Sequence, residues 1–348
     1  MIEVVNLQKT YPGTRGTLSR GEVRALRGVS LGIARGGALA LIGESGCGKT
    51  TLGRIVTGLE SHTGGEVLID GAKVSDLPVA SRRAQFRKVQ LIHQDPYAAL
   101  NPTRTIANAL FDPLRLQARR SGKDQAWIER RAVELLRLVG LDASETLYKY
   151  PHQLSGGQRQ RVVIARALTV EPEALVADEA VSMIDVSLRL GVLNLLSQLR
   201  KELNISIIFI THDVAAARYV AQGGLTAVIY RGEIVEMGPT DDLIQRPVHP
   251  YTQSLLSAVP VLHGLETEGP DRFIPRPSEQ DEARETTGCL FAERCPFADD
   301  GCRTQHPEPT PWDGVPDTRQ VACFKPHVRK VVAVPIAVGA GESAHDGA

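Results

Sequence analysis

The chain has 348 residues, 42% of them hydrophobic, which is enough for one large α/β domain and a smaller second domain. Forty basic residues balance forty acidic ones, so the overall charge does not favour binding to nucleic acid or to an anionic membrane. No apolar run approaches the length of a membrane span and no signal peptide is recognisable, so we expect a cytosolic protein.

The N-terminal part of the chain alternates apolar and polar residues in the manner of β-strands. Residues 2–11 and 23–33 predict two strands separated by a loop over 12–21, and they favour an antiparallel β lobe. Two further strands are predicted over 64–71, which ends in a turn, and over 88–94, which ends at Gln94.

An apolar run over 38–42 leads into a glycine-rich loop and then into a helical pattern. The loop has the G-x4-G-K-T spacing of a P-loop in the strand–loop–helix context that this motif requires. Its glycines allow consecutive backbone N–H groups to converge on a phosphate at the positive end of the helix. The candidate nucleotide-binding residues are Gly43, Glu44, Ser45, Gly46, Cys47, Gly48, Lys49, Thr50 and Thr51.

Two P-loop residues have specific expected roles. Lys49 is placed to reach the β- and γ-phosphates as a point charge, and the Thr50 hydroxyl is placed to ligate Mg²⁺. Cys47 has no role of its own in this interpretation.

Residues 105–141 change to helical spacing and stop at Gly140, which indicates an inserted helical subdomain. The sequence L-S-G-G-Q follows at 154–158 and precedes an apolar helix. Ser155 is expected to cap this helix, so that its first turn presents backbone N–H groups to a second anion. Gly156, Gly157 and Gln158 complete this second candidate site.

Two buried strands deliver polar residues at their carboxyl ends, where ligands bind in parallel α/β sheets. The run 174–177 is followed by Asp178 and Glu179, and the run 206–211 is followed by His212. Between them, leucines and a valine over 188–203 fall at helical spacing and predict a stripe that packs on the sheet. Further strands are predicted over 225–230 and 233–237.

Proline becomes frequent from Pro239 onward, so we expect a main domain at 1–245 and a C-terminal region at 246–330. The helical subdomain is expected over about 95–165, inside the main domain. Residues 331–348 lack useful periodicity and are expected to be a poorly ordered tail.

These motifs, in this order, resemble the nucleotide-binding subunit of ATP-binding-cassette (ABC) transporters across about residues 1–260. Y-A-A-L-N-P at 97–102, T-L-G-R at 51–54 and H-P-Y-T at 249–252 narrow the resemblance to the oligopeptide/dipeptide importer ATPases, especially their second ATPase subunit. The fold implied is an α/β P-loop NTPase core of the ABC type. It has a mostly parallel sheet, an antiparallel β lobe, an inserted helical subdomain and a small cysteine-containing C-terminal region.

The resemblance implies roles for the remaining residues. Glu179 is expected to be the general base, His212 to contact the γ-phosphate and Gln94 to sense it together with Mg²⁺. Asp178 is expected to bind Mg²⁺ through water, and Tyr11 to stack on adenine. Where the family usually has E-P-T-S-A-L-D, this chain has E-A-V-S-M-I-D at 179–185. In the family this loop lies across the dimer interface and couples the two ATP sites. Because positions 180–184 are altered here, the resemblance does not extend to cooperativity between the sites.

The resemblance also implies partners and a location. ATP is expected to lie between two cassettes, from two copies of the chain or from this chain and a second ABC ATPase subunit. Two transmembrane permease subunits would dock near Gln94 and the region 95–150, with an extracytoplasmic solute-binding protein as an indirect partner. The chain would lie at the cytoplasmic face of the cell membrane as a peripheral subunit, without nucleic acid.

Other functions remain open at the level of sequence. A soluble ABC ATPase acting on the ribosome or on nucleic acid is one alternative, although this chain has one cassette and no sustained heptad pattern. An importer for nickel or sugar is another. A catalytically inactive regulatory subunit is a third, against which the retained Glu179 and His212 argue.

Four of the five cysteines, Cys289, Cys295, Cys302 and Cys323, lie near the C-terminus. An odd number of cysteines argues against a disulfide framework. Four thiolates suit a structural zinc ion or a [4Fe–4S] cluster, and free or oxidised thiols are the alternative. The segment 291–297 resembles the importer family's tail motif, and this resemblance favours the cluster.

Overall fold

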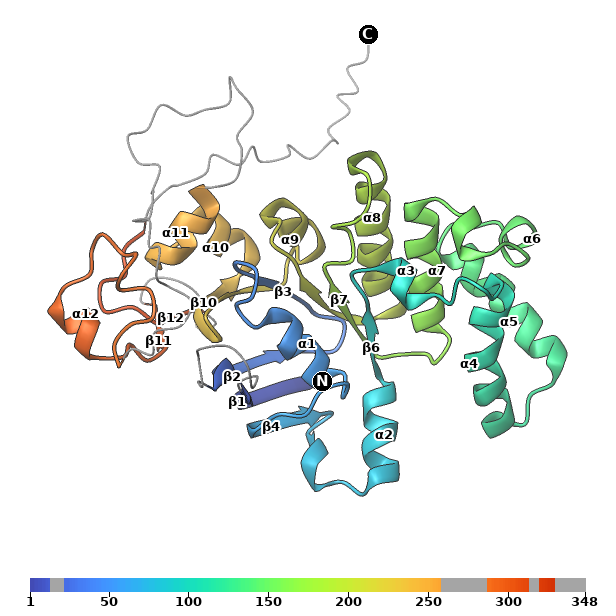
Figure 1. Ribbon diagram of the computed structural model, residues 1–348, viewed down its shortest axis with the longest axis horizontal. Coiled ribbons are helices and arrows are strands. Elements are labelled where there is room, and N and C mark those ends of the chain that lie inside the picture. Colours follow the sequence, from blue (N-terminus) through green and yellow to red (C-terminus); the bar gives the residue numbers. More distant parts are fainter. Residues whose placement is uncertain (13–21, 258–286, 313–318, 329–348) are drawn as a thin grey trace, which may run out of the picture.

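The computed structural model describes residues 1–12, 22–257, 287–312 and 319–328. Two sheets form its framework (Figure 1). The larger has eight strands in the order β11-β12-β10-β9-β3-β8-β7-β6, and the smaller has four in the order β2-β1-β4-β5. The expected tail at 331–348 and most of the expected loop at 12–21 lie outside the described residues.

Five neighbouring strands of the larger sheet are parallel: β6 (Val89–Ile92), β7 (Ala174–Asp178), β8 (Ser206–Ile210), β3 (Ala38–Ile42) and β9 (Leu225–Tyr230). Every residue of β3, β7 and β8 is buried, as expected for continuous apolar runs in a parallel sheet. The carboxyl ends of these strands share one edge, and that edge carries the P-loop after β3, Asp178 and Glu179 at the end of β7, and His212 after β8.

The antiparallel lobe predicted from the N-terminal sequence is present. It consists of β1 (Ile2–Tyr11), β2 (Val23–Ile33), β4 (Gly64–Ile69) and β5 (Ala72–Lys73). Helix α1 (Lys49–Val56) follows β3, and its buried residues pack into one core together with both sheets. A short 3₁₀ turn (Val74–Asp76) and α2 (Val79–Arg87) then lead to β6.

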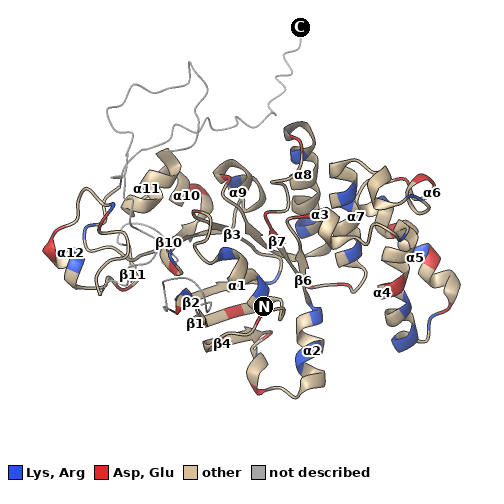
Figure 2. Ribbon diagram, viewed as in Figure 1, with Lys and Arg blue, Asp and Glu red and all other residues tan. Residues whose placement is uncertain are grey.

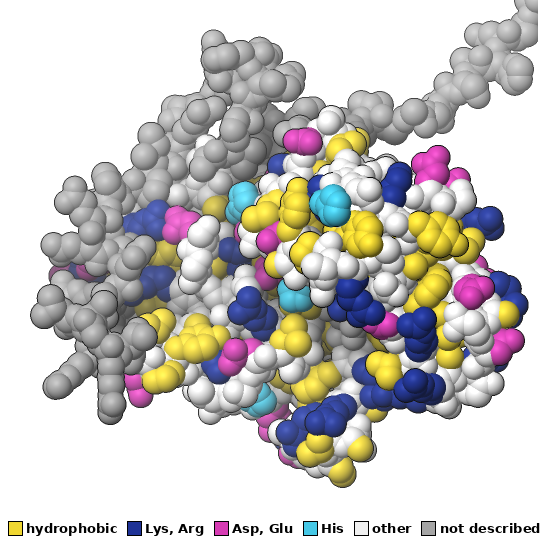
Figure 3. Space-filling model, turned by 45° about the vertical axis from the view of Figure 1, so that its right-hand side comes forward, with side chains coloured by type: hydrophobic (Ala, Val, Ile, Leu, Met, Phe, Trp, Pro, Cys, Tyr) yellow, Lys and Arg dark blue, Asp and Glu magenta, His cyan; other side chains and the backbone are white. Residues whose placement is uncertain are grey.

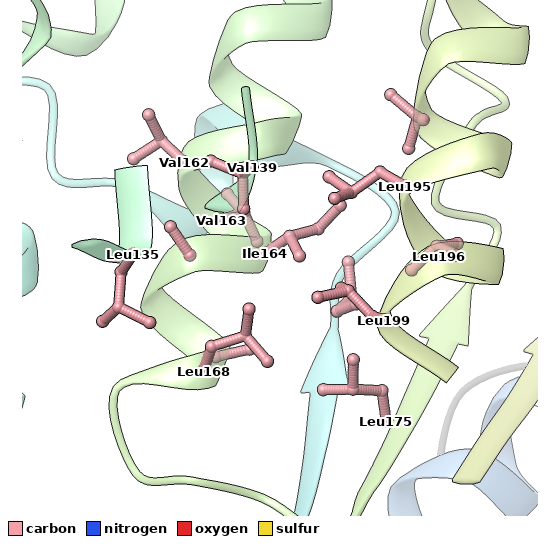
Figure 4. Close-up of a cluster of buried hydrophobic side chains, with 14 of the residues drawn as sticks. Leu135, Val139, Val162, Val163, Ile164, Leu168, Leu175, Leu195, Leu196 and Leu199 are labelled. Carbon is pink, nitrogen blue, oxygen red and sulfur yellow. The ribbon is translucent and has the colours of Figure 1, made fainter. Parts of the chain in front are cut away.

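A group of helices lies beyond β6, at the right of Figure 1. It comprises α3 (Pro96–Ala99), α4 (Ile106–Ser121), α5 (Gln125–Leu138), α6 (Ala143–Thr146), a 3₁₀ turn (Pro151–Gln153) and α7 (Gly156–Leu168). Leucine, isoleucine and valine side chains from α5, α7, β7 and α8 (Val186–Leu203) form its core (Figure 4). Burying one such side chain contributes about 1.5–3 kcal/mol.

The C-terminal residues pack on the opposite end of the larger sheet, at the left of Figure 1. After β9 come β10 (Glu233–Pro239), α10 (Thr240–Gln245) and α11 (Pro250–Ser257), with α9 (Val214–Val220) between β8 and β9. Helix α12 (Asp300–Thr304) and the two-residue strands β11 (Thr310–Pro311) and β12 (Gln320–Val321) complete the region. Because β12 pairs with β10, the C-terminal region extends the cassette's own sheet.

The apolar stripe predicted on α8 is buried only in its middle. Val192, Leu195, Leu196 and Leu199 are buried, but Leu188 is 42% exposed and Leu203 is 45% exposed. The prediction that all of the stripe belongs to the core was therefore wrong at both ends. Leu188 is the third residue of α8, in its first turn, where it lies against Gly157 of α7, and Leu203 is the last residue of the helix.

Charged side chains of both signs are distributed over the surface, in line with the net charge of 0 (Figures 2 and 3). Within the described ranges, no helix has the length and apolar character needed to cross a membrane.

Candidate active site

The P-loop joins β3 to α1 and is held in a conformation that needs glycine. Gly43 and Gly48 have φ of 156° and 107°. A Cβ added at Gly43 would lie 2.2 Å from the Ile229 carbonyl oxygen, and one added at Gly48 would lie 2.4 Å from that of Ala25. Both positive φ and lack of space therefore exclude side chains here.

Lys49 is buried, with 5% of its surface exposed. Its Nζ donates to the carbonyl oxygens of Gly43 and Glu44, each at 2.8 Å, and lies 3.5 Å from Cys47 Sγ. The loop thus folds back over its own lysine. Phosphate oxygens offer the ammonium stronger, charge-assisted acceptors than these carbonyls do.

Two of the three residues expected at the Mg²⁺ site, Thr50 and Asp178, are in contact. The Thr50 hydroxyl donates to Asp178 Oδ1 at 3.1 Å, across from the first turn of α1 to the end of β7. Burial raises the pKa of Asp178, with the Thr50 hydroxyl acting in the opposite direction. A hydroxyl and a carboxylate are oxygen donors of the kind that Mg²⁺ prefers, so these residues fit the ion. Gln94 is exposed just after β6, the strand that neighbours β7.

Glu179 and His212 are brought together from the ends of two neighbouring strands. Glu179 Oε1 lies 3.2 Å from His212 Nδ1. The Glu179 backbone N–H donates to the Ile210 carbonyl at 2.9 Å, and its own carbonyl accepts from the Ser182 hydroxyl at 2.9 Å. Glu179 has φ of 47°, a left-handed conformation that costs a non-glycine residue about 1–2 kcal/mol. Strain of this kind concentrates at functional sites.

Ser155 caps α7 as predicted. Its Oγ accepts from the Gln158 N–H at 3.2 Å, and Gln158 Oε1 accepts from the Ser155 N–H at 3.0 Å. A groove of about 310 Å³ lies beside this turn and is lined by Ser155, Gly157, Gln158, Gly140, Leu141, Arg161, Ser187, Leu188 and Gly191. Within the described ranges, the side-chain hydrogen bonds of Ser155 and Gln158 join these two residues and do not reach the P-loop.

Tyr11 is the last residue of β1 and is partly exposed. The Lys9 ammonium lies 4.7 Å from the centre of its ring. Residues 13–21, which follow it, lie outside the described part of the chain, so stacking on adenine stays a prediction.

Two C-terminal residues contact the P-loop, Tyr251 and Arg294, and no local sequence pattern predicts a role for either. The Tyr251 hydroxyl accepts from the Glu44 N–H at 2.9 Å, and Arg294 makes an ion pair with the Glu44 carboxylate. Both residues lie in motifs that had been noted, H-P-Y-T and the segment 291–297, but no local pattern indicates a contact over such a separation.

The four C-terminal cysteines line one small apolar cavity of about 20 Å³ together with Phe291, Phe297 and Phe324. All four are free thiols, as is Cys47. Burial raises the pKa of Cys289 to about 11 and that of Cys323 to about 12. Over the described residues, no group of three or more His, Cys, Asp or Glu side chains is arranged to hold a metal ion. The cavity therefore gathers the thiols without showing a metal centre.

A second groove, of about 270 Å³, lies between the edge strand β6 and the helices beyond it. Its lining includes Leu59, Gln90, His93, Ala99 and Arg166. His93 in this lining directly precedes Gln94 in the sequence.

Comparison with known proteins places this geometry in a family. Residues 26–182 match the family model described as ABC transporter, and residues 235–302 match that of the oligopeptide/dipeptide transporter C-terminal region. The chain is similar to the di/tripeptide transport ATP-binding protein DppF of Pseudomonas aeruginosa, with 41% identity over 322 residues that cover 91% of this chain and 95% of that protein. It is also similar to the oligopeptide transport ATP-binding protein AppF of Bacillus subtilis, with 38% identity over 311 residues, covering 88% and 93%.

Solved structures of ABC transporter cassettes are also similar to this chain. The dimeric ATP-binding cassette MJ0796, in a post-hydrolysis state with ADP and Pi, covers 69% of this chain and 99% of its own, with a TM-score of 0.60 and 30% identity. CbiO1 of Clostridium perfringens, part of an ABC transporter complex, covers 70% and 89%, with a TM-score of 0.58 and 26% identity. The P-loop, the paired Asp178–Glu179, His212 and the matched C-terminal region together show that this chain belongs to the ATP-binding subunits of ABC transporters, and is an ABC ATPase of the oligopeptide/dipeptide transporter type.

Proposed function

We propose that this chain hydrolyses Mg-ATP to drive a peptide importer, with Glu179 as the general base. The observation that carries the catalytic part is the 3.2 Å contact between Glu179 and His212 at the sheet edge that also carries the Thr50–Asp178 pair. Relatives named for di/tripeptide and oligopeptide transport, which match along nearly the whole chain, support the peptide part.

The chemistry follows from where these groups lie. Lys49 would exchange the carbonyls of Gly43 and Glu44 for the β- and γ-phosphate oxygens, while Thr50, Asp178 and Gln94 would hold Mg²⁺. When bound, the ion neutralises phosphate charge and orients the phosphates. Glu179 takes a proton from a water whose oxygen bonds to the γ-phosphorus as the bond to the bridging oxygen breaks. His212 faces Glu179 and would contact the γ-phosphate.

The solute can be tested in cells whose endogenous copy is replaced by the wild-type chain or by Glu179→Gln. Uptake of a labelled dipeptide should require the wild-type chain, while uptake of labelled nickel and of a sugar should be equal in both strains. Equal dipeptide uptake in both strains would show that the chain does not energise peptide import, and loss of nickel or sugar uptake alone would reassign the solute.

We further propose that two cassettes enclose ATP between the P-loop of one and the 154–158 turn of the other. The open groove beside Ser155 and the dimeric form of MJ0796 support this arrangement. The second cassette is another copy of this chain or a second ABC ATPase subunit.

The groove between β6 and the helices beyond it supports docking of a permease subunit there, with Gln94 next to the contact. Two permease subunits would then hold the chain as a peripheral subunit at the cytoplasmic face of the membrane, with an extracytoplasmic solute-binding protein as an indirect partner. We propose a nucleotide-binding domain at 1–245 with helical subdomain 95–165, and a C-terminal region at 246–330.

A [4Fe–4S] cluster held by Cys289, Cys295, Cys302 and Cys323 is the remaining proposal. Four thiols around one apolar cavity suit a thiolate-bound cluster, and zinc is the alternative metal. Because burial raises the pKa of the Cys289 and Cys323 thiols, loading must displace their protons and bring the four sulfurs into a ligating arrangement.

A further inference from the structure

Glu44 occupies the first variable position of the P-loop, and its carboxylate is held from the far end of the chain. Arg294 Nη1 lies 2.9 Å from Oε2, and Nη2 lies 2.9 Å from Oε1. Two parallel N–H···O bonds form the fork-to-carboxylate geometry that is stronger and more specific than a single contact. The two residues are 250 positions apart in sequence.

The surroundings of Arg294 restrict its guanidinium. Its side chain is 19% exposed, against 44% for Glu44. The guanidinium carbon lies 5.6 Å from the ring centre of Phe291 and 5.9 Å from that of Tyr230. Phe291 is itself buried and packs edge-on against Tyr230 and Tyr251. The guanidinium of Arg294 is therefore held beside a packed cluster of aromatic rings.

The C-terminal region is fastened to the cassette independently of this pair. Arg319 is fully buried and bonds to Glu236 of β10 at 2.5 Å and to Asp242 of α10 at 2.6 Å. Strand β12 pairs with β10 next to it. The region that carries Arg294 is therefore anchored to the cassette by contacts that do not involve Arg294.

Every polar group of Glu44 has a partner. Its N–H donates to the Tyr251 hydroxyl, its carbonyl accepts from Lys49 Nζ, and its carboxylate is taken by Arg294. The pairing with Glu44 raises the pKa of Arg294, so the guanidinium stays charged. An unpaired carboxylate in a loop that wraps a polyphosphate would repel the ligand, since like charges at short range oppose each other.

We propose that Arg294 is a positioning residue for ATP binding: it neutralises the carboxylate of Glu44 and fixes the entrance of the P-loop, so that the C-terminal region of this ABC ATPase contributes directly to its nucleotide affinity. The inference rests on ATP binding at the P-loop and not on the identity of the transported solute or on any metal at the cysteines.

The two partners are predicted to have opposite single-substitution effects. In full-length protein, Arg294→Ala should raise KM for ATP, and the dissociation constant of a fluorescent ATP analogue, by about fivefold with kcat within twofold, because ground-state binding is lost. Glu44→Gln should lower both constants below the wild-type values, because it removes a negative charge next to the bound polyphosphate. The double variant Arg294→Ala/Glu44→Gln should return to within about twofold of wild type.

Matched controls separate this role from general stability. Arg303→Ala removes another arginine of the same region, which pairs with an exposed Asp300 at 3.7 Å, and should leave KM unchanged. If Arg294→Ala does not fold, Arg294→Lys and Glu44→Gln carry the test. Lysine keeps the charge but loses the bidentate fork, so Arg294→Lys should raise KM by about two- to threefold, less than alanine does. The inference is overturned if Arg294→Ala (or Arg294→Lys, where alanine does not fold) leaves KM for ATP within about 1.5-fold of the wild-type value. It is also overturned if Glu44→Gln weakens ATP binding, or if the double variant binds ATP as weakly as Arg294→Ala.

Discussion

Glu179 shows how backbone contacts set the direction of a single side chain. Its left-handed φ of 47° turns the chain sharply at the end of β7, and its backbone is fixed by Ile210 on one side and Ser182 on the other. These contacts aim the carboxylate at His212. An aspartate would lack the reach for the 3.2 Å contact, and a glutamine would keep the shape but lose the basic oxygen.

Glu179→Gln should therefore retain Mg-ATP binding and lower kcat by about 10²–10⁴-fold, the usual contribution of a general base. Steady-state ATPase rates and equilibrium binding of a fluorescent ATP analogue provide the two measurements. Glu171→Gln, a substitution of an exposed glutamate that also has positive φ, serves as the control and should hydrolyse ATP at the wild-type rate. Wild-type turnover in Glu179→Gln would refute the assignment of the base.

Helix α7 depends on the capping box of Ser155 and Gln158 for its first turn. The same turn borders the groove at which the second cassette is proposed to dock. A substitution at Ser155 therefore combines a loss of capping, worth about 1 kcal/mol, with whatever it does at the interface. Removing the cap of a different helix, away from the groove, separates the loss of capping from the effect at the interface.

Ser155→Arg is expected to abolish ATP-driven pairing of cassettes in the Glu179→Gln background, because a long charged side chain fills the proposed contact. Asp124→Arg removes the cap of α5, where Asp124 accepts from the Trp127 N–H at 2.9 Å, and should lower stability by a similar amount without affecting pairing. Light scattering with and without Mg-ATP reports the association. Unchanged pairing in Ser155→Arg would contradict the proposal that two cassettes enclose ATP between them.

His249, at the start of α11, couples that element's stability to pH. It is buried, its Nδ1 accepts from the Tyr251 N–H at 3.0 Å, and burial lowers its pKa to about 3. The unfolded chain binds this proton below about pH 6.5 and the folded chain does not. The stabilisation is thus complete above about pH 6.5 and is lost as the pH falls, by about 1.4 kcal/mol per pH unit down to about pH 3.

Denaturant unfolding at pH 7.5, 6 and 5 (values spanning roughly this window) can measure the effect. The free energy of unfolding of the wild type should fall relative to that of His249→Gln across the series, because glutamine has no proton to gain. Parallel curves for the two proteins would show that His249 is not held in its neutral form.

At the scale of the whole molecule, the cassette's sheet joins two outlying parts. The helices beyond β6 form a groove at one end, and the cysteine-lined cavity lies in the region attached at the other. The segments that hold the cysteines contain little regular structure, so the proposed cluster would add stability to this region if it is bound there.

Anaerobically purified protein is expected to contain about four irons per chain and to absorb near roughly 400 nm, as thiolate-bound clusters do. Cys295→Ser should lose both signals and unfold at a lower temperature. Cys47→Ser, which changes the cysteine outside the cavity, should keep the iron. Absence of iron and of the absorption band from wild-type protein would exclude the cluster. One zinc ion per chain in its place would show that the cysteines hold zinc instead.

Docking of the permease predicts where crosslinks form. A photoreactive side chain at Ala99, which lines the groove, should crosslink to a permease subunit in membranes containing the whole transporter. The same group at Arg303 on α12 should not. Crosslinks confined to position 303 would place the membrane partner on the C-terminal region instead.

Much of this protein was determined by its sequence alone. The P-loop, the Ser155 cap and the polar residues after β7 and β8 were predicted because glycine conformations, capping and strand ends depend on residues within a few positions of one another. Parallel pairing then brought Glu179 and His212 together, as strand ends at a common edge require. The prediction that Leu188 and Leu203 belong to the core was wrong, because helical periodicity identifies the face of the helix on which a side chain lies but not whether another element covers that face.

Only the tertiary structure decided which C-terminal residues touch the P-loop. The sequence around Arg294 does not predict its ion pair with Glu44. That contact depends on β10 and on the aromatic cluster of Tyr230, Tyr251 and Phe291, which place the C-terminal region beside the P-loop. The gathering of four widely spaced cysteines around one cavity has the same origin. Such contacts form when buried apolar surface and a continuous sheet fix the path of the chain, and they have no signature within any short stretch of sequence.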